Sequence, residues 1–243
     1  MRKPLHIMAV GAHILDAEIT CGMTLAKHSM QGDKITTVAL TAGEGGHPEG
    51  MDIEDFRKMN IEGATKFAET LGGKFICMNY TDSGVPETEE IYDAFADLVR
   101  REKPDIILTH WSESYHEDHA LTSKIVRIGV RRAAFVPSKT LPAHFVRSIL
   151  YAENWEDEKG FIPYIYVDVT DSFELWREAV KNIYAATRST YFDYLGYYDA
   201  LSLTRGYRAA ITNKECKRAE CFALSEMDRF GMRQVKSDLS FDD

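Results

Sequence analysis

The sequence predicts an α/β fold: a Rossmann-like, mostly parallel sheet with helices on both faces and a helical C-terminal part. Short apolar or β-branched runs of strand length recur through the first two thirds of the chain, and longer segments with helical spacing lie between them. This alternation is typical of a parallel sheet covered on both faces. After Val169 the strand-like runs stop, and the sequence becomes helical in pattern and rich in aromatic residues.

Each expected element has its own pattern. Six apolar or β-branched runs predict strands, at residues 5–10, 34–40, 75–79, 105–109, 148–152 and 164–169. Between the first four runs, three segments have the spacing of helices, at residues 18–31, 53–71 and 89–101. In the second of these, Phe56, Ala64 and Phe67 fall on one face, and Gly72 and Gly73 end the helix. We expect one domain over residues 1–243, with 170–243 as its helical C-terminal extension.

Composition narrows the class of protein. Apolar residues make up 44% of the 243 residues and charged residues 28%, which is typical of a globular protein. The net charge of -9 argues against a general affinity for nucleic acid or anionic membrane, so neither is expected as a partner. The four cysteines form no CxxC pair, which favours reduced thiols. With no transmembrane-length apolar run and no signal-peptide pattern at the start, we expect a cytoplasmic protein.

Two polar clusters follow expected strands. His13, Asp16 and Glu18 come directly after the first strand, and His116 and His119 come after the fourth. Ligands bind beyond the carboxyl ends of the strands in doubly wound sheets, where strands one and four can be neighbours. Taken alone, the first cluster could be only a helix N-cap and a loop histidine.

Together the clusters predict a metal site. His13, Asp16 and one of the two later histidines would supply two nitrogens and one oxygen and leave a position for water, which is the composition of a catalytic zinc site. His110, beside Trp111, is expected to be a packed, hydrogen-bonded residue. No glycine-rich phosphate loop with its lysine is present in the sequence, which disfavours a nucleotide-binding module.

The order of four short motifs resembles the PIG-L/LmbE-like zinc-dependent deacetylases, which remove acetyl groups from N-acetylglucosamine-type substrates. These motifs are AHILDAE at 12–18, TAGEGG at 41–46, DSG at 82–84 and HEDH at 116–119, and the resemblance covers about the first 130 residues. It implies that His13, Asp16 and His119 bind Zn²⁺ or another divalent metal. It also implies that His116 acts as general acid or electrostatic stabiliser, with Asp118 orienting it.

The resemblance also implies a function. We expect a metal-dependent hydrolase that removes an N-acyl group from an amino-sugar-like small molecule, with a homo-oligomer as a further expectation. Asp82 of the DSG motif is expected to contact the substrate. An arginine on the second helix holds the substrate in the family, but the matching position is Asn60, and Arg57 lies one turn earlier. Arg57 is therefore either a substrate contact or part of a surface salt bridge.

Leu15 departs from the family pattern, because the family has there the aspartate presumed to take a proton from the attacking water. General-base assistance is typically worth about 10²- to 10⁴-fold in rate. Three interpretations stay open. The base has moved, with Glu44 or Glu18 as the candidates; or the site performs slow or different hydrolysis with the metal and His116; or the chain is a catalytically impaired relative that binds metal and a sugar-like ligand.

A histidine held by a neighbouring carboxylate has a raised pKa, and this is the expectation for His116.

Overall fold

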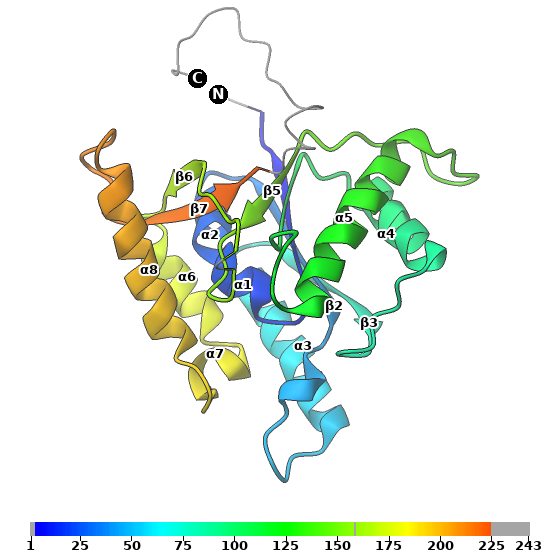
Figure 1. Cartoon of the computed structure of the whole chain (residues 1–243), viewed down its shortest axis with the longest axis horizontal. Helices are drawn as coiled ribbons and strands as arrows, with labels where there is room; N and C mark the ends of the chain where they lie inside the picture. The colour runs from blue at the N-terminus through cyan, green and yellow to red at the C-terminus, as the bar shows by residue number, and fades with distance from the viewer. Residues whose placement is uncertain (1–2, 158, 225–243) are drawn as a thin grey trace, which may run out of the picture.

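The computed structural model describes residues 3–157 and 159–224, and in them seven strands form one sheet in the order β3-β2-β1-β4-β5-β7-β6 (Figure 1). The first five strands in this order are parallel, and β7 is antiparallel to both β5 and β6. The α/β class and the mostly parallel sheet are thereby confirmed. The strands are β1 (His6–Gly11), β2 (Lys34–Thr41), β3 (Lys74–Tyr80), β4 (Ile106–Thr109), β5 (Ser148–Ala152), β6 (Ile165–Asp168) and β7 (Ala219–Ala223).

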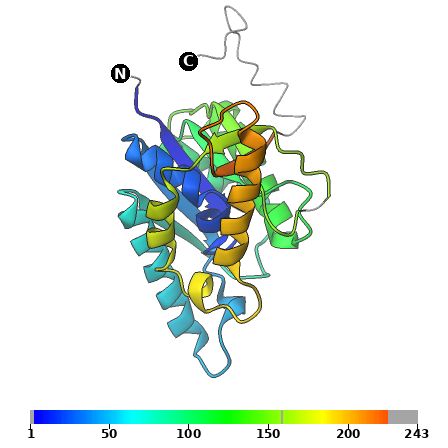
Figure 2. The same cartoon turned by 90° about the vertical axis from the view of Figure 1, so that its left-hand side faces the viewer.

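Helices cover both faces of the sheet (Figures 1 and 2). Each face has its own apolar core. Phe95 on α4 and Ile125 on α5 pack on one face, whereas Phe67 on α3 and Trp176 on α6 pack on the other, together with α1, α2 and α8. The helices are α1 (Asp16–Thr20), α2 (Gly22–Met30), α3 (Ile53–Thr70), α4 (Glu89–Glu102), α5 (Glu117–Phe135), α6 (Phe173–Val180), α7 (Tyr184–Arg188) and α8 (Tyr194–Ala209), with a short 3-10 helix η1 (Glu44–Gly46).

The helix expected at 18–31 is divided in two at Cys21. In an unbroken helix the Glu18 carbonyl would accept a hydrogen bond from the amide four residues later, at Gly22. Instead it accepts one from the Trp176 indole Nε1, at 2.7 Å. A Cβ at position 22 would lie 2.4 Å from Trp176 Cδ1, so only glycine lets the indole approach the backbone there. Packing against α6 thus separates the short α1 from α2.

The C-terminal part is not entirely helical, because β7 inserts between β5 and β6. The expectation of helices after Val169 holds for α6, α7 and α8, and it is wrong for Ala219–Ala223. Glu220 on β7 is buried, and its carboxylate accepts hydrogen bonds from the amides of Met23 (2.9 Å) and Thr24 (2.7 Å) in the first turn of α2. Amides in the first turn of a helix have no hydrogen-bond acceptor within the helix, and the Glu220 carboxylate supplies one for these two. Residues 225–243 of the expected extension lie outside the described residues.

The strand order places the two polar clusters together. β1 pairs with β2 on one side and with β4 on the other, so the direction of winding reverses between β1 and β4. The expected contact of strands one and four is confirmed, and their carboxyl ends open into the same crevice. No helix among the residues described has both the length and the apolar character to cross a membrane.

Candidate functional site

A pocket lies at the carboxyl ends of β1 and β4. Its walls come from the turn after β1, the loop around η1, the turn at Asp82 and Ser83, the start of α5, the segment after β5, and the helices α3, α7 and α8. Three segments far apart in sequence, around residues 13, 82 and 119, therefore meet at one edge of the sheet. This is the edge at which doubly wound folds bind ligands.

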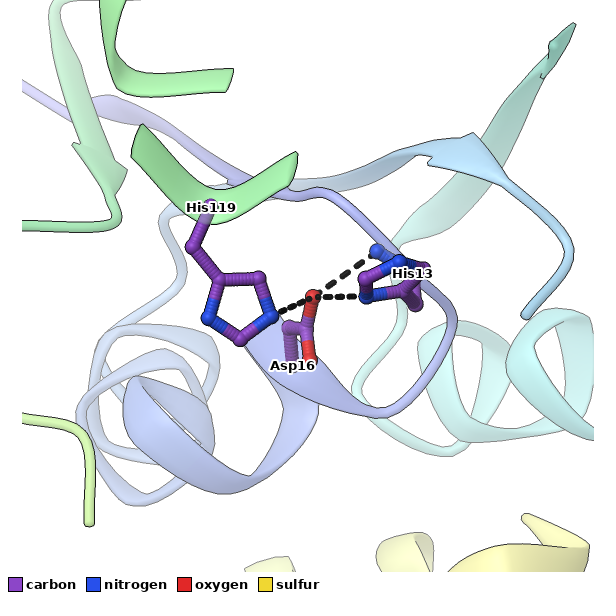
Figure 3. Close-up of side chains that lie close together, drawn as sticks. All are labelled: His13, Asp16 and His119. Carbon is purple, nitrogen blue, oxygen red and sulfur yellow. Dashed lines mark hydrogen bonds and ion pairs between the residues drawn. The ribbon is translucent and has the colours of Figure 1, made fainter. Parts of the chain in front are cut away.

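Asp16 is at the centre of the pocket's polar cluster. Its Oδ2 lies 3.2 Å from His13 Nδ1 and 3.4 Å from His119 Nε2. Figure 3 marks both contacts with dashed lines. The candidate ligand atoms of these three residues all lie within 4.8 Å of one another. Two imidazole nitrogens and one carboxylate oxygen are a donor set that suits zinc. The structure therefore brings together the three residues expected to bind a metal.

Local structure explains these positions. Asp16 Oδ2 accepts a hydrogen bond from the His13 amide at 2.8 Å, which closes the turn after β1. A Cβ at position 11 would lie 2.8 Å from Asp16 Cβ, so Gly11 lets this turn fold back tightly. On the other side, His116 caps the N-terminus of α5 and its Nδ1 accepts from the Asp118 amide at 3.3 Å. His119 is consequently held in the first turn of α5, facing Asp16.

The second nitrogen of His13 faces two more carboxylates. His13 Nε2 lies 3.1 Å from Asp118 Oδ2 and 3.3 Å from Asp82 Oδ1. Asp118 Oδ2 also accepts from the Ser83 amide at 3.0 Å. The carboxylate that was expected to orient His116 thus contacts His13 directly. A histidine that donates one N–H to a carboxylate presents its other nitrogen in a fixed direction, which is how metal-binding histidines are usually held.

The carboxylates around His13 favour positive charge in this pocket. Burial by itself lowers the pKa of His13, but Asp16 and the hydrogen bonds with Asp118 and Asp82 outweigh burial and raise this pKa to about 12. Burial likewise opposes ionisation of Asp82, yet contact with His13 lowers the Asp82 pKa to about 2. The field of the site therefore suits a bound cation.

His116 has a different electrostatic environment. Burial lowers its pKa, and the nearby charges of His119 and His13 lower it further. The expectation of a raised pKa for His116 is therefore wrong, because the Asp118 carboxylate lies against His13. The His116 and His119 rings stack with their centroids 4.4 Å apart, so His116 is at the wall of the pocket beside the three candidate ligands.

Leu15 lines the pocket in a strained backbone conformation. Its side chain is 5% exposed, and its φ is 104°, where non-glycine residues are rare and where asparagine and aspartate are tolerated best. The Leu15 amide donates to Glu18 Oε2 at 3.0 Å. The turn thus has a backbone that suits aspartate while its side chain is apolar.

The two candidate replacement bases lie outside the pocket lining. Glu44 Oε1 accepts from Arg57 Nη1 at 3.1 Å and from the Asp82 amide at 3.0 Å. Glu18 is buried under the turn, where burial raises its pKa to about 7. Neither side chain is part of the pocket wall, whereas Asp82 is. Arg57 is turned toward Glu44, and Asn60 lines the pocket one turn further along α3.

Four polar residues of the site were not among the expected site residues. His110 is buried, stacks on His119 with centroids 4.0 Å apart, and has Nε2 3.2 Å from Asp16 Oδ2. Asn154, Glu156 and Tyr198 lie on the far side of His119. Asn154 and Glu156 follow β5, which is the next parallel strand after β4. The strand-end rule that identified the first two clusters would have identified these two residues as well.

The fold and the site define a doubly wound α/β protein with a histidine and carboxylate pocket where the winding reverses. The family model of PIG-L, described as GlcNAc-PI de-N-acetylase, matches residues 8–129. This chain belongs to the PIG-L family, and the resemblance noted in the sequence is confirmed.

Individual relatives are more distant. The chain is 26% identical over 174 residues to the uncharacterized deacetylase YaiS of Escherichia coli, covering 69% of this chain and 83% of that protein. It is also 26% identical over 184 residues to the diacetylchitobiose deacetylase of Thermococcus kodakarensis, and the match covers 72% of this chain and 67% of that protein. Among solved structures, GalB, the 4-carboxy-2-hydroxymuconate hydratase of Pseudomonas putida, superimposes with a TM-score of 0.79 at 22% identity, covering 91% of this chain and 98% of that one. This last likeness concerns the fold alone.

Proposed function

We propose that this protein is a metal-dependent hydrolase that removes an N-acyl group, such as acetyl, from an amino-sugar-like small molecule or glycoconjugate. The observation that carries the proposal is the convergence of His13, Asp16 and His119 on one pocket at the strand ends. The deacetylases among the relatives support the reaction class, and the diacetylchitobiose deacetylase supports the substrate class.

The donor set fits a zinc ion. Two imidazole nitrogens and one carboxylate oxygen, with room for a further ligand on the pocket side, are typical of catalytic zinc sites. The charge of the surrounding carboxylates, which raises the pKa of His13, supports a cation in this position. When bound, zinc polarises a carbonyl and makes water a better nucleophile near neutral pH.

His116 is proposed to act as an electrostatic stabiliser that donates a hydrogen bond to the reacting amide. Its Nδ1 accepts a hydrogen bond from the Asp118 amide and therefore carries no proton. In the neutral ring the proton is consequently on Nε2. The neutral ring therefore offers an N–H from the wall of the pocket as a hydrogen-bond donor to the oxygen that gains negative charge during hydrolysis. In this proposal Asp118 and Asp82 hold the ring of His13, and Asp82, which lines the pocket, also contacts substrate hydroxyl groups.

Position 15 supplies no proton acceptor, and the geometry gives Glu44 a different role. Its carboxylate is engaged by Arg57 and by the Asp82 amide, so we propose that Glu44 supports the Asp82 turn and takes no proton itself. With Leu15 in the wall, hydrolysis is expected to be slow. An impaired relative that binds metal and a sugar-like ligand is the alternative function, and Leu15 is the observation that favours it.

The charge of the pocket bears on the choice of substrate. Among the described residues, its lining contains no lysine or arginine, while Phe56, Trp155 and Tyr194 add aromatic surface. Arg57 is held by Glu44 and by Asn79 Oδ1 at 3.2 Å. A substrate with several carboxylates, such as the one that the name of the hydratase GalB describes, would find no basic partner in this wall. An uncharged, polyhydroxylated molecule suits it better.

The test begins with the metal content of protein purified without added metal. It continues with an amine-release assay on N-acetylated sugars and glycosides. Stoichiometric zinc together with released amine supports the hydrolase. Zinc without turnover on any of these compounds supports the impaired relative, and protein that takes up no divalent metal contradicts both.

A further inference from the structure

Asn154, in the segment after β5, contacts His119 in a fixed orientation. Its Oδ1 accepts from the Trp155 amide at 2.8 Å and from the Tyr198 hydroxyl at 2.8 Å. Because a backbone amide can only donate, this contact identifies which end of the Asn154 side chain is the oxygen. The other end, Nδ2, lies 3.2 Å from His119 Nδ1. Asn154 therefore presents an N–H to that ring nitrogen.

This contact selects one tautomer of His119. To accept the N–H of Asn154, Nδ1 must carry no proton, so the proton of the neutral ring is on Nε2, 3.4 Å from Asp16 Oδ2. A metal ligand must be the unprotonated nitrogen. For His119 Nε2 to bind a cation, the ring proton has to move to Nδ1 and find an acceptor there.

Glu156 is placed to be that acceptor. Its Oε2 lies 3.5 Å from His119 Nδ1, slightly beyond a good hydrogen bond. The same oxygen is buried and has no hydrogen-bond partner in the described part of the chain. A buried carboxylate oxygen without such a partner is costly, which points to a role in another state of the site.

We propose that Glu156 is a positioning residue that accepts the Nδ1–H of His119 when Nε2 binds a divalent cation, whereas Asn154 holds the opposite tautomer when the cation is absent. The inference rests on the metal site proposed above and extends it to residues beyond the family motifs. Asn154 and Glu156 would together set the cation affinity, because each stabilises one of the two tautomers of the same ring.

The test measures Zn²⁺ affinity by competition with a chelator, and records the absorption spectrum of the Co²⁺-loaded protein. Glu156→Ala should weaken Zn²⁺ binding about 10- to 100-fold, the usual effect of losing a residue that supports a metal ligand. Glu174→Ala, which removes an exposed carboxylate on α6, is the matched control and should leave the affinity unchanged. Circular dichroism of each variant establishes that it is folded.

A second substitution distinguishes positioning from general packing. Asn154→Asp puts a carboxylate oxygen where Nδ2 was, next to His119 Nδ1, and keeps an oxygen for Trp155 and Tyr198. The double variant Glu156→Ala/Asn154→Asp should bind Zn²⁺ at least tenfold more tightly than Glu156→Ala alone. Its Co²⁺ spectrum should match that of the wild-type protein.

Wild-type affinity in Glu156→Ala, or no recovery in the double variant, would overturn the role of Glu156 while leaving the metal site in place. A wild-type protein that binds neither Zn²⁺ nor Co²⁺ would instead refute the metal site itself, and this inference with it.

Discussion

Replacing Leu15 by aspartate is the sharpest test of how this site works. Leu15 is 5% exposed, and losing its buried side chain costs about 1.5–3 kcal/mol. Its φ of 104° stores about 1–3 kcal/mol of strain, part of which aspartate relieves. The two effects oppose each other, so we expect Leu15→Asp to change the free energy of unfolding by less than about 2 kcal/mol.

The expected gain in activity is much larger than this change in stability. If hydrolysis is slow because no group accepts the proton of the attacking water, a carboxylate at position 15 should raise kcat about 10²- to 10⁴-fold. This corresponds to a barrier lowered by about 3–5 kcal/mol. The assay is amine release from N-acetylated sugars and glycosides, with zinc content measured on the same samples.

Leu15→Asn is the matched control, because asparagine has the same shape as aspartate and also tolerates positive φ but is not a base. Leu15→Asn should change the free energy of unfolding through any relief of backbone strain, and it should not raise kcat. The reasoning is refuted if the zinc-loaded Leu15→Asp variant is no faster than Leu15→Asn on every substrate of the panel. That result would mean that another group already takes the proton or that the pocket no longer binds such substrates.

Three further predictions concern the ligands, the Asp82 turn and the C-terminal strand. His119→Ala should lose stoichiometric zinc and keep its circular dichroism spectrum, and retained zinc would contradict its role as ligand. Glu44→Gln should keep zinc and change turnover less than about tenfold, whereas a loss of about 100-fold or more would identify Glu44 as the proton acceptor. Burial raises the pKa of Glu220 from 4.5 to about 7, so the folded chain binds this proton more tightly, and the carboxyl's contribution to the free energy of unfolding falls as pH rises across that interval. Glu220→Gln should flatten this part of the pH dependence in urea unfolding, and an unchanged slope would contradict the assignment.

The parallel part of the fold could be predicted because its signals are local. Each of β1 to β5 is an apolar run at a strand-like spacing, and winding rules then place β4 beside β1. β7 could not be found in this way, since its five residues lie in a helical context and are stabilised by pairing with β5 and β6. The break at Cys21 was also beyond sequence patterns, because the cause is a tryptophan that lies more than 150 residues further along the chain.

The candidate site also has parts that the sequence could predict and parts that it could not. His13, Asp16 and His119 could be predicted, because they follow strand ends that share one edge of the sheet. Which nitrogen of His13 faces which carboxylate could not, because three separate segments together determine the rotation of the ring. The contact of the Asp118 carboxylate with His13 depends on that rotation, so the motif HEDH could not predict it, whereas the Asp118 amide does contact His116.

The bond between Glu220 and the start of α2 has a consequence for biosynthesis. The amide of Met23 finds its partner 197 residues later in the chain. A ribosome making this protein releases the turn after β1 long before it releases β7, so the first turn of α2 must wait for its buried carboxylate until these 197 further residues have been made. The segment from β1 to α2 is therefore expected to emerge as a nascent chain that cannot complete its structure before β7 has been made, and that needs protection from aggregation until then.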